Sequence, residues 1–70
     1  MAILIRLKFY KHVNCSDMVI QALRCVRIAA GWKVKAHYYS LGYDRHTLID
    51  TGNQEEILIS NEQIPNWKPF

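Results

Sequence analysis

Basic and aromatic side chains alternate with apolar ones in the stretch GWKVKAHYYSLGY, residues 31–43. On a β-strand, successive side chains point to opposite faces of the sheet, so the basic and aromatic set would share one face. Its members are Lys33, Lys35, His37 and Tyr39. Cations bind phosphates and aromatic rings stack on bases, a combination that single-stranded RNA binders present on sheet faces. The stretch predicts either such a binding face or an ordinary solvated face.

A second alternating segment, AILIRLKFY at residues 2–10, indicates another half-buried strand. Its outward side chains would include two cations and a tyrosine. If this strand lay beside the strand at 32–41, the two outward sets would form one basic and aromatic surface. The residues predicted to bind nucleic acid or a protein partner there are Arg6, Lys8, Tyr10, Lys33, Lys35, His37 and Tyr39.

Acid–base catalysis would require a histidine with an orienting acid and a nearby nucleophile. The chain has three histidines, His12, His37 and His46, and Asp44 or Asp50 could orient the last of them. Nothing in the spacing fixes that geometry, and isolated histidines are usually ordinary surface or half-buried residues. We therefore expect no enzyme, no catalytic residue and no cofactor.

The two cysteines, Cys15 and Cys25, do not form a CxxC pair or part of a four-ligand zinc pattern. We therefore expect no metal and a reducing, cytoplasmic setting. The most apolar run, residues 18–30, contains Arg24 and Arg27 and is too short to span a bilayer. No secretory signal is recognised near the start, so no membrane association is expected.

Charge is unevenly distributed along the 70 residues, whose formal net charge is +3. Residues 1–40 carry seven bases and one acid, whereas residues 41–70 carry two bases and five acids. Such asymmetry can indicate nucleic acid or an acidic partner. If the two halves share one sheet, their charges partly neutralise each other instead, and this interpretation is favoured.

Residues 14–30 are predicted to form a helix. Asn14 can cap its start with Asp17 in the first turn, and Gly31 can end it. Gln21 and Arg24 continue a narrow polar stripe at helical spacing. The β-branched residues of this segment argue against a helix, but the caps and the polar stripe outweigh them.

Strands are predicted at 32–41, 45–51 and 55–60, joined by turns around Gly42 and Gly52. The chain is then a single domain, residues 1–70, of the α+β class. One helix would pack on one face of a four-stranded, mainly antiparallel sheet, in the order β-α-β-β-β. The alternative is a small, strongly bent barrel of the four strands with the helix plugging one end.

The segment IPNWKPF ends the chain, and its Trp67 and Phe70 are predicted to be interface anchors. Small size, a helix more apolar than a sheet face requires, and exposed aromatic residues favour a non-enzymatic intracellular binding module. It would dock on another protein as a regulator, inhibitor or accessory subunit, alone or as a homodimer. The alternative is binding of RNA or single-stranded DNA through the basic and aromatic sheet face.

Overall fold

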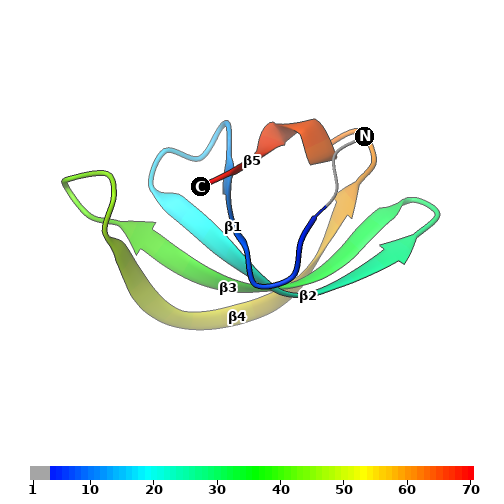
Figure 1. Ribbon diagram of the computed structural model, residues 1–70, viewed down its shortest axis with the longest axis horizontal. Coiled ribbons are helices and arrows are strands. Elements are labelled where there is room, and N and C mark those ends of the chain that lie inside the picture. The colour runs from blue at the N-terminus through cyan, green and yellow to red at the C-terminus, as the bar shows by residue number, and fades with distance from the viewer. Residues whose placement is uncertain (1–3) are drawn as a thin grey trace.

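The computed structural model describes residues 4–70 of the chain. They form one antiparallel sheet of five strands in the order β4-β3-β2-β1-β5. Its elements in chain order are β1 (Phe9–His12), β2 (Met18–Ile28), β3 (Gly31–Leu41), β4 (Leu48–Ser60), the 3₁₀ helix η1 (Ile64–Asn66) and β5 (Trp67–Pro69). The three long strands curve together into a trough, and β1, β5 and η1 lie on its concave side (Figure 1).

The predicted helix at 14–30 is wrong, and so is the α+β fold class, because this segment supplies β2 and the chain is nearly all β. Within residues 4–70 the helical structure is the single short turn η1. β-branched side chains favour an extended backbone, and Val19, Ile20 and Val26 lie in this strand. The barrel alternative is wrong as well, because the five-stranded sheet is open, with β4 and β5 at its two ends, and no helix of the predicted kind is present in the described residues.

A β-bulge explains why β2 resembles a helix in sequence. The register between β2 and β3 shifts between Ala22 and Arg24, which leaves Leu23 as an extra residue. Ala22 is fully buried in the core, and the extra residue turns Arg24 to the opposite face. The outward residues Gln21 and Arg24 are therefore three positions apart, a spacing typical of one helix face.

The core fills the concave side of the trough. Ala22 and Ala36 lie opposite each other in β2 and β3, and both are fully buried. Their small side chains leave room for larger side chains of the same buried cluster, such as Leu4, Tyr10 and Ile64. The buried cluster consists of Leu4, Tyr10, Ile20, Ala22, Val34, Ala36, Ile59 and Ile64. Burying one aliphatic side chain of this kind contributes about 1.5–3 kcal/mol, so these residues hold η1 and the β1 side of the curved sheet against the long strands.

The strand predicted at 32–41 is confirmed as β3 (Gly31–Leu41), in which exposed Lys33 and Lys35 alternate with buried Val34 and Ala36. The turn predicted after it is also present. Asp44 organises this turn, because its carboxylate accepts hydrogen bonds from the backbone N–H groups of His46 and Thr47 at 3.0 and 2.9 Å. Gly42 N–H donates to the Thr47 carbonyl oxygen at 2.9 Å and closes the hairpin.

The strands predicted at 45–51 and 55–60 are one continuous strand, β4. His37 pairs with Gln54 and Tyr39 pairs with Asp50, so residues 51–53 bulge out opposite a single residue of β3. Gly52 has a φ of 76°, the left-handed conformation that glycine adopts at little cost. The glycine signal was thus real, but it marks a wide bulge within a strand and not a hairpin turn.

The strand predicted at 2–10 begins only at Phe9 in the described chain, and residues 1–3 lie outside it. Residues 5–8 form a turn in which the Lys8 N–H donates to the Ile5 carbonyl oxygen at 3.2 Å. The turn is fastened to β2, because Leu7 N–H donates to the Ala22 carbonyl oxygen at 2.6 Å. β1 then pairs with β2 on one side and with β5 on the other.

Gly31 is not the end of a helix but the first residue of β3, after a tight turn from β2. It is buried where the backbones of β3 and β4 approach closely. A Cβ atom at this position would lie 2.1 Å from the Ile59 carbonyl oxygen and 2.7 Å from Ser60 Cα. Only glycine fits, because the atoms in the way belong to backbone.

Gly31→Ala should therefore lower the free energy of unfolding by about 3 kcal/mol, since backbone cannot move aside as a side chain can. Gly52→Ala is the control, because a Cβ there meets no atom within 4 Å. Its cost is limited to the positive φ, about 1 kcal/mol. Urea unfolding followed by tryptophan fluorescence measures both. Equal losses in the two variants would contradict the close approach at Gly31.

Candidate functional site

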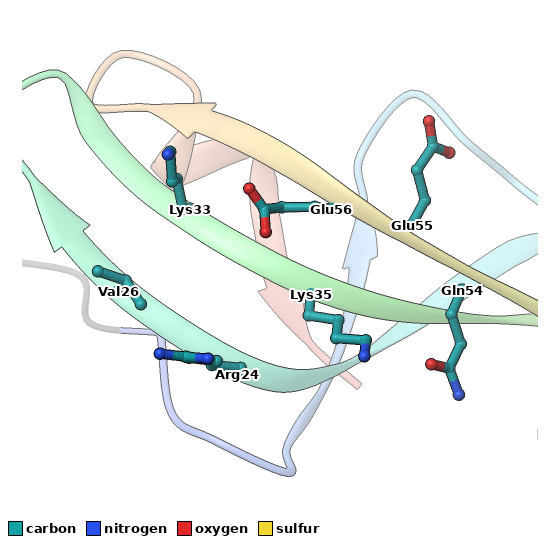
Figure 2. A pocket seen from close by; sticks show the side chains of 7 residues that line it. All are labelled: Arg24, Val26, Lys33, Lys35, Gln54, Glu55 and Glu56. Carbon is teal, nitrogen blue, oxygen red and sulfur yellow. The ribbon is translucent and has the colours of Figure 1, made fainter.

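The outward face of the long strands carries a groove, which we name the basic groove. Directly opposite residues of antiparallel strands point to the same face, so the register defines its rows. Arg24, Lys35 and Glu56 form one row across β2, β3 and β4. Val26, Lys33 and Leu58 form the next. Figure 2 shows the residues that line the groove, namely Arg24, Val26, Lys33, Lys35, Gln54, Glu55 and Glu56.

The cations of the basic groove have no carboxylate partner in residues 4–70, where the ion pairs are His37–Asp50 and Arg45–Asp17. Arg24 and Lys35 lie directly opposite each other. Like charges in that relation destabilise a sheet by about 0.2–1 kcal/mol. Glu56 is opposite Lys35 but makes no ion pair with it. The groove therefore holds three cations beside two carboxylates, Glu55 and Glu56, and two of the cations lie directly opposite each other at a cost in stability.

His37 and Tyr39 continue the same face, but each is engaged by neighbours. His37 Nε2 lies 2.5 Å from Asp50 Oδ1, and its Nδ1 lies 3.1 Å from Gln54 Nε2. These contacts fasten the two sides of the β4 bulge, and the His37 side chain is only 14% exposed. The Tyr39 hydroxyl donates to Gln21 Oε1 at 3.2 Å.

A small aromatic cluster surrounds Tyr39. Its ring meets the Phe9 ring edge to face with the centroids 5.6 Å apart, and the His37 centroid lies 4.9 Å away. Val19, directly opposite Tyr39 on β2, is fully buried although it belongs to the outward face. Val19 and the surrounding aromatic rings therefore form a small apolar cluster on this face, separate from the main core, and the aromatic residues themselves are half-buried.

The other predicted binding residues lie elsewhere. β2 separates β1 from β3, so the two alternating segments are not neighbours. Tyr10 is a core residue, 4% exposed, and its hydroxyl oxygen accepts a hydrogen bond from Ile5 N–H at 2.7 Å. Arg6 Nε donates to the Leu23 carbonyl oxygen at 3.3 Å. Lys8 is exposed beside an apolar groove.

That apolar groove, which we name the Leu7 patch, joins the 5–8 turn to the end of the chain. Ile5 and Leu7 are each 53% exposed and Phe70 is 46% exposed. Phe70 N–H donates to the Phe9 carbonyl oxygen at 3.0 Å, which holds the chain end against β1. The groove is lined by Ile5, Leu7, Lys8, Phe9, Tyr10, Pro69 and Phe70.

Leu7 has a φ of 68°, in the left-handed region. This conformation costs a non-glycine residue about 1–2 kcal/mol. Besides the bond from its N–H to Ala22, its carbonyl oxygen accepts a hydrogen bond from Gln21 Nε2 at 3.3 Å. The chain thus holds a strained backbone in place while leaving the leucine side chain half in solvent.

The two predicted anchors differ in exposure. Phe70 belongs to the Leu7 patch, as described. Trp67 is half-buried, packs against the core, and meets the His12 ring edge to face at 5.0 Å between centroids. Through these contacts the Trp67 ring packs β5 against the core and against His12 of the neighbouring strand β1.

The acid–base pairing considered for His46 is not formed with Asp44. Asp44 meets the backbone N–H of His46, and its other oxygen accepts a hydrogen bond from the Thr47 hydroxyl at 2.6 Å. These bonds, those to Thr47 foremost, lower the pKa of Asp44 to about 2. Burial raises the pKa of the Cys25 thiol. Within residues 4–70 no three potential metal ligands among His, Cys, Asp and Glu gather together.

Sequence reasoning missed Arg24, Gln54 and Glu56 in the basic groove. Each is placed there by pairing with β3 beside an irregularity, the β2 bulge for Arg24 and the wide β4 bulge for Gln54 and Glu56. The available signal for Arg24 was the β-branched composition around it, which favours a strand over a helix.

Comparison with known proteins provides no relative: no protein-family model, curated protein or solved structure matches this chain. No helix within the described residues is long and apolar enough to cross a membrane.

The His37–Asp50 contact predicts a pH dependence of stability. The hydrogen bond to His37, followed by that from Gly52 N–H, lowers the pKa of Asp50 in the folded protein. A lowered folded-state pKa gives stability above the unfolded value, near 3.8, that is lost as the pH falls through the folded one. Asp50→Asn should therefore flatten the fall in unfolding free energy below about pH 4.

Urea unfolding between about pH 2 and pH 6 measures this slope. Asp44→Asn is the comparison, because its carboxyl also has a lowered pKa and its substitution should flatten the same acid range. His37→Gln removes the first cause of the Asp50 shift and should reduce the slope as well. A wild-type slope in both Asp50→Asn and His37→Gln would contradict the assignment.

Proposed function

We propose that this protein is a non-enzymatic binding module that docks on another protein through the Leu7 patch. It would act as a regulator, an inhibitor or an accessory subunit. The observation that carries the proposal is Leu7, a strained residue whose apolar side chain is left half exposed. Backbone strain of this kind occurs preferentially at functional sites.

The Leu7 side chain is not part of the buried core, so core packing does not account for its strained backbone. Glycine would adopt the same φ at no steric cost and could keep the bond from its N–H to Ala22. A leucine here presents about half of its surface to solvent next to Ile5 and Phe70, which are similarly exposed. Contiguous exposed apolar side chains mark interaction sites on small proteins.

The chemistry of the patch indicates the chemistry of the partner. Its floor is apolar and aromatic, which suits an apolar side chain of the partner as an anchor. Lys8 lines the groove, and Arg6 is exposed next to Leu7 in the chain. A protein surface with an apolar centre and carboxylates at its margin would complement both features.

Leu7→Gly should weaken docking at least ten-fold without loss of stability, because it removes the side chain and relieves the strain. We expect the free energy of unfolding to rise by up to about 1 kcal/mol, because release of the αL strain, about 1–2 kcal/mol, is partly offset by the greater backbone freedom that glycine loses on folding. Phe70→Ala should weaken docking as well. Ile49→Ser is the matched control, because Ile49 is 52% exposed on β4 and lies outside the patch.

Capture from an extract of the source organism on immobilised protein identifies the partner, and titration with the purified partner gives the affinities. The partner should bind wild type and Ile49→Ser equally and bind Leu7→Gly at least ten-fold more weakly, the effect of one interface anchor of about 1.4 kcal/mol or more. Sedimentation shows whether that partner is a second copy of this chain. Equal binding by Leu7→Gly would exclude the patch as the docking site.

A further inference from the structure

We propose that the basic groove binds single-stranded nucleic acid. The groove lies on the outward face of β2, β3 and β4, and none of its lining residues belongs to the Leu7 patch. Of the aromatic residues that extend this surface, only Phe9 also lines the Leu7 patch, and the substitutions tested below leave Phe9 in place. This inference therefore goes beyond the docking function and stands independently of it.

The distribution of charge on the outward face is the first argument. Besides Arg24 opposite Lys35, a second pair of cations, Lys11 and Lys68, lies directly opposite across β1 and β5. In residues 4–70 none of these four, nor Lys33, has a carboxylate within ion-pairing distance. Two repulsive pairs on one face of a small sheet lower its stability. An anionic ligand would turn that repulsion into binding energy.

The register makes this outward face continuous. One row runs Lys68, Lys11, Val19, Tyr39 and Asp50 across all five strands. The next row runs Phe9, Gln21, His37 and Gln54, and the Arg24 row follows it. The aromatic cluster of Phe9, Tyr39 and His37 thus lies between the two cationic pairs.

This order of side chains distinguishes nucleic acid from an acidic peptide as the ligand. Cations that follow a backbone, together with aromatic rings on which bases stack, are the common design of single-strand binding surfaces. Phe9 and Tyr39 are half-buried, so each keeps part of its surface accessible to solvent. The amide of Gln54, at the edge of the groove, adds a polar group beside these rings.

Three carboxylates oppose the ligand, and one of them makes a sharp test possible. Glu55 lines the groove, but its carboxylate accepts a hydrogen bond from the Tyr38 hydroxyl at 3.3 Å. Asp50 is held by His37 at one margin, whereas Glu56 lies within the groove opposite Lys35. Removing the charge of Glu56 should strengthen binding of an anion, a result that damage to the fold could not produce. Glu56 is exposed, so Glu56→Gln should leave stability unchanged.

The experiment uses the full chain and a fluorescent single-stranded DNA of mixed sequence, about twelve nucleotides long, with anisotropy as the signal. With about three phosphate contacts, the slope of log affinity against log salt should be about −2. Affinity should then fall roughly twenty-fold between about 50 and 200 mM salt. Lys35→Gln should weaken binding and make the slope shallower by about 0.7.

Tyr39→Leu separates stacking from charge. It should lower affinity by roughly ten-fold, the effect of one stacked base, while leaving the salt slope unchanged. Lys8→Gln is the control for Lys35→Gln, because it removes a positive charge from an exposed residue outside the groove. Glu62→Gln is the control for Glu56→Gln, because it removes a negative charge from another such residue. Both should bind as the wild type does. Leu7→Gly should also bind normally, which keeps this test separate from the docking function.

Four results would overturn the proposal. They are absence of binding at low salt, an equal loss in Lys8→Gln and Lys35→Gln, equal affinity for a duplex of the same length, and equal displacement by polyglutamate. The second would mean that binding follows net charge alone. The last would mean that the groove takes an acidic protein segment. Thermal melting of each variant confirms that the fold is intact before its affinity is compared.

Discussion

The extra residue at Leu23 is the constraint on which the rest of the structure depends. On the N-terminal side of this bulge, Ile20 and Ala22 face the core. On its C-terminal side Cys25 packs inward and Arg24 points outward. Without the extra residue, alternation from Ala22 would direct Arg24 into a core whose described residues offer it no acidic partner. One inserted residue thus separates the apolar interior from the basic outward face.

Unbroken alternation predicted one strand correctly but not another, because residues 2–10 alternate cleanly yet form a turn at 5–8 and pair as β1 only from Phe9. β3 was predicted nearly to the residue, because apolar and polar side chains alternate from Trp32 to Tyr38. β2 was taken for a helix, because its bulge changes the spacing of outward residues from two to three between Gln21 and Arg24. β4 was divided in two, because Gly52 marks bulges and hairpin turns alike. Both errors arise where a strand departs from period two.

The candidate surfaces show the same limit. Lys33 and Lys35 share a face because they are two residues apart on one strand, which the sequence states directly. The position of Arg24 beside Lys35 depends on pairing between strands, which no local pattern contains. Tyr10 alternates like a surface residue, yet its strand is covered on that side by the core, where its hydroxyl finds the Ile5 N–H. Alternation therefore grouped the residues of β3 correctly, but it showed neither that residues 5–8 leave the strand nor that Tyr10 is buried.

The wide bulge at residues 51–53 has a consequence for association between copies of the chain. β4 lies at one end of the strand order, so one side of its backbone lacks a neighbouring strand within the described sheet. Such an edge is a template on which another chain can add a strand. The bulge, with Gly52 in the left-handed conformation, divides this long edge into two short segments that cannot share one straight partner. The irregularity that His37 fastens is thereby also a guard against aggregation at the open edge of the sheet.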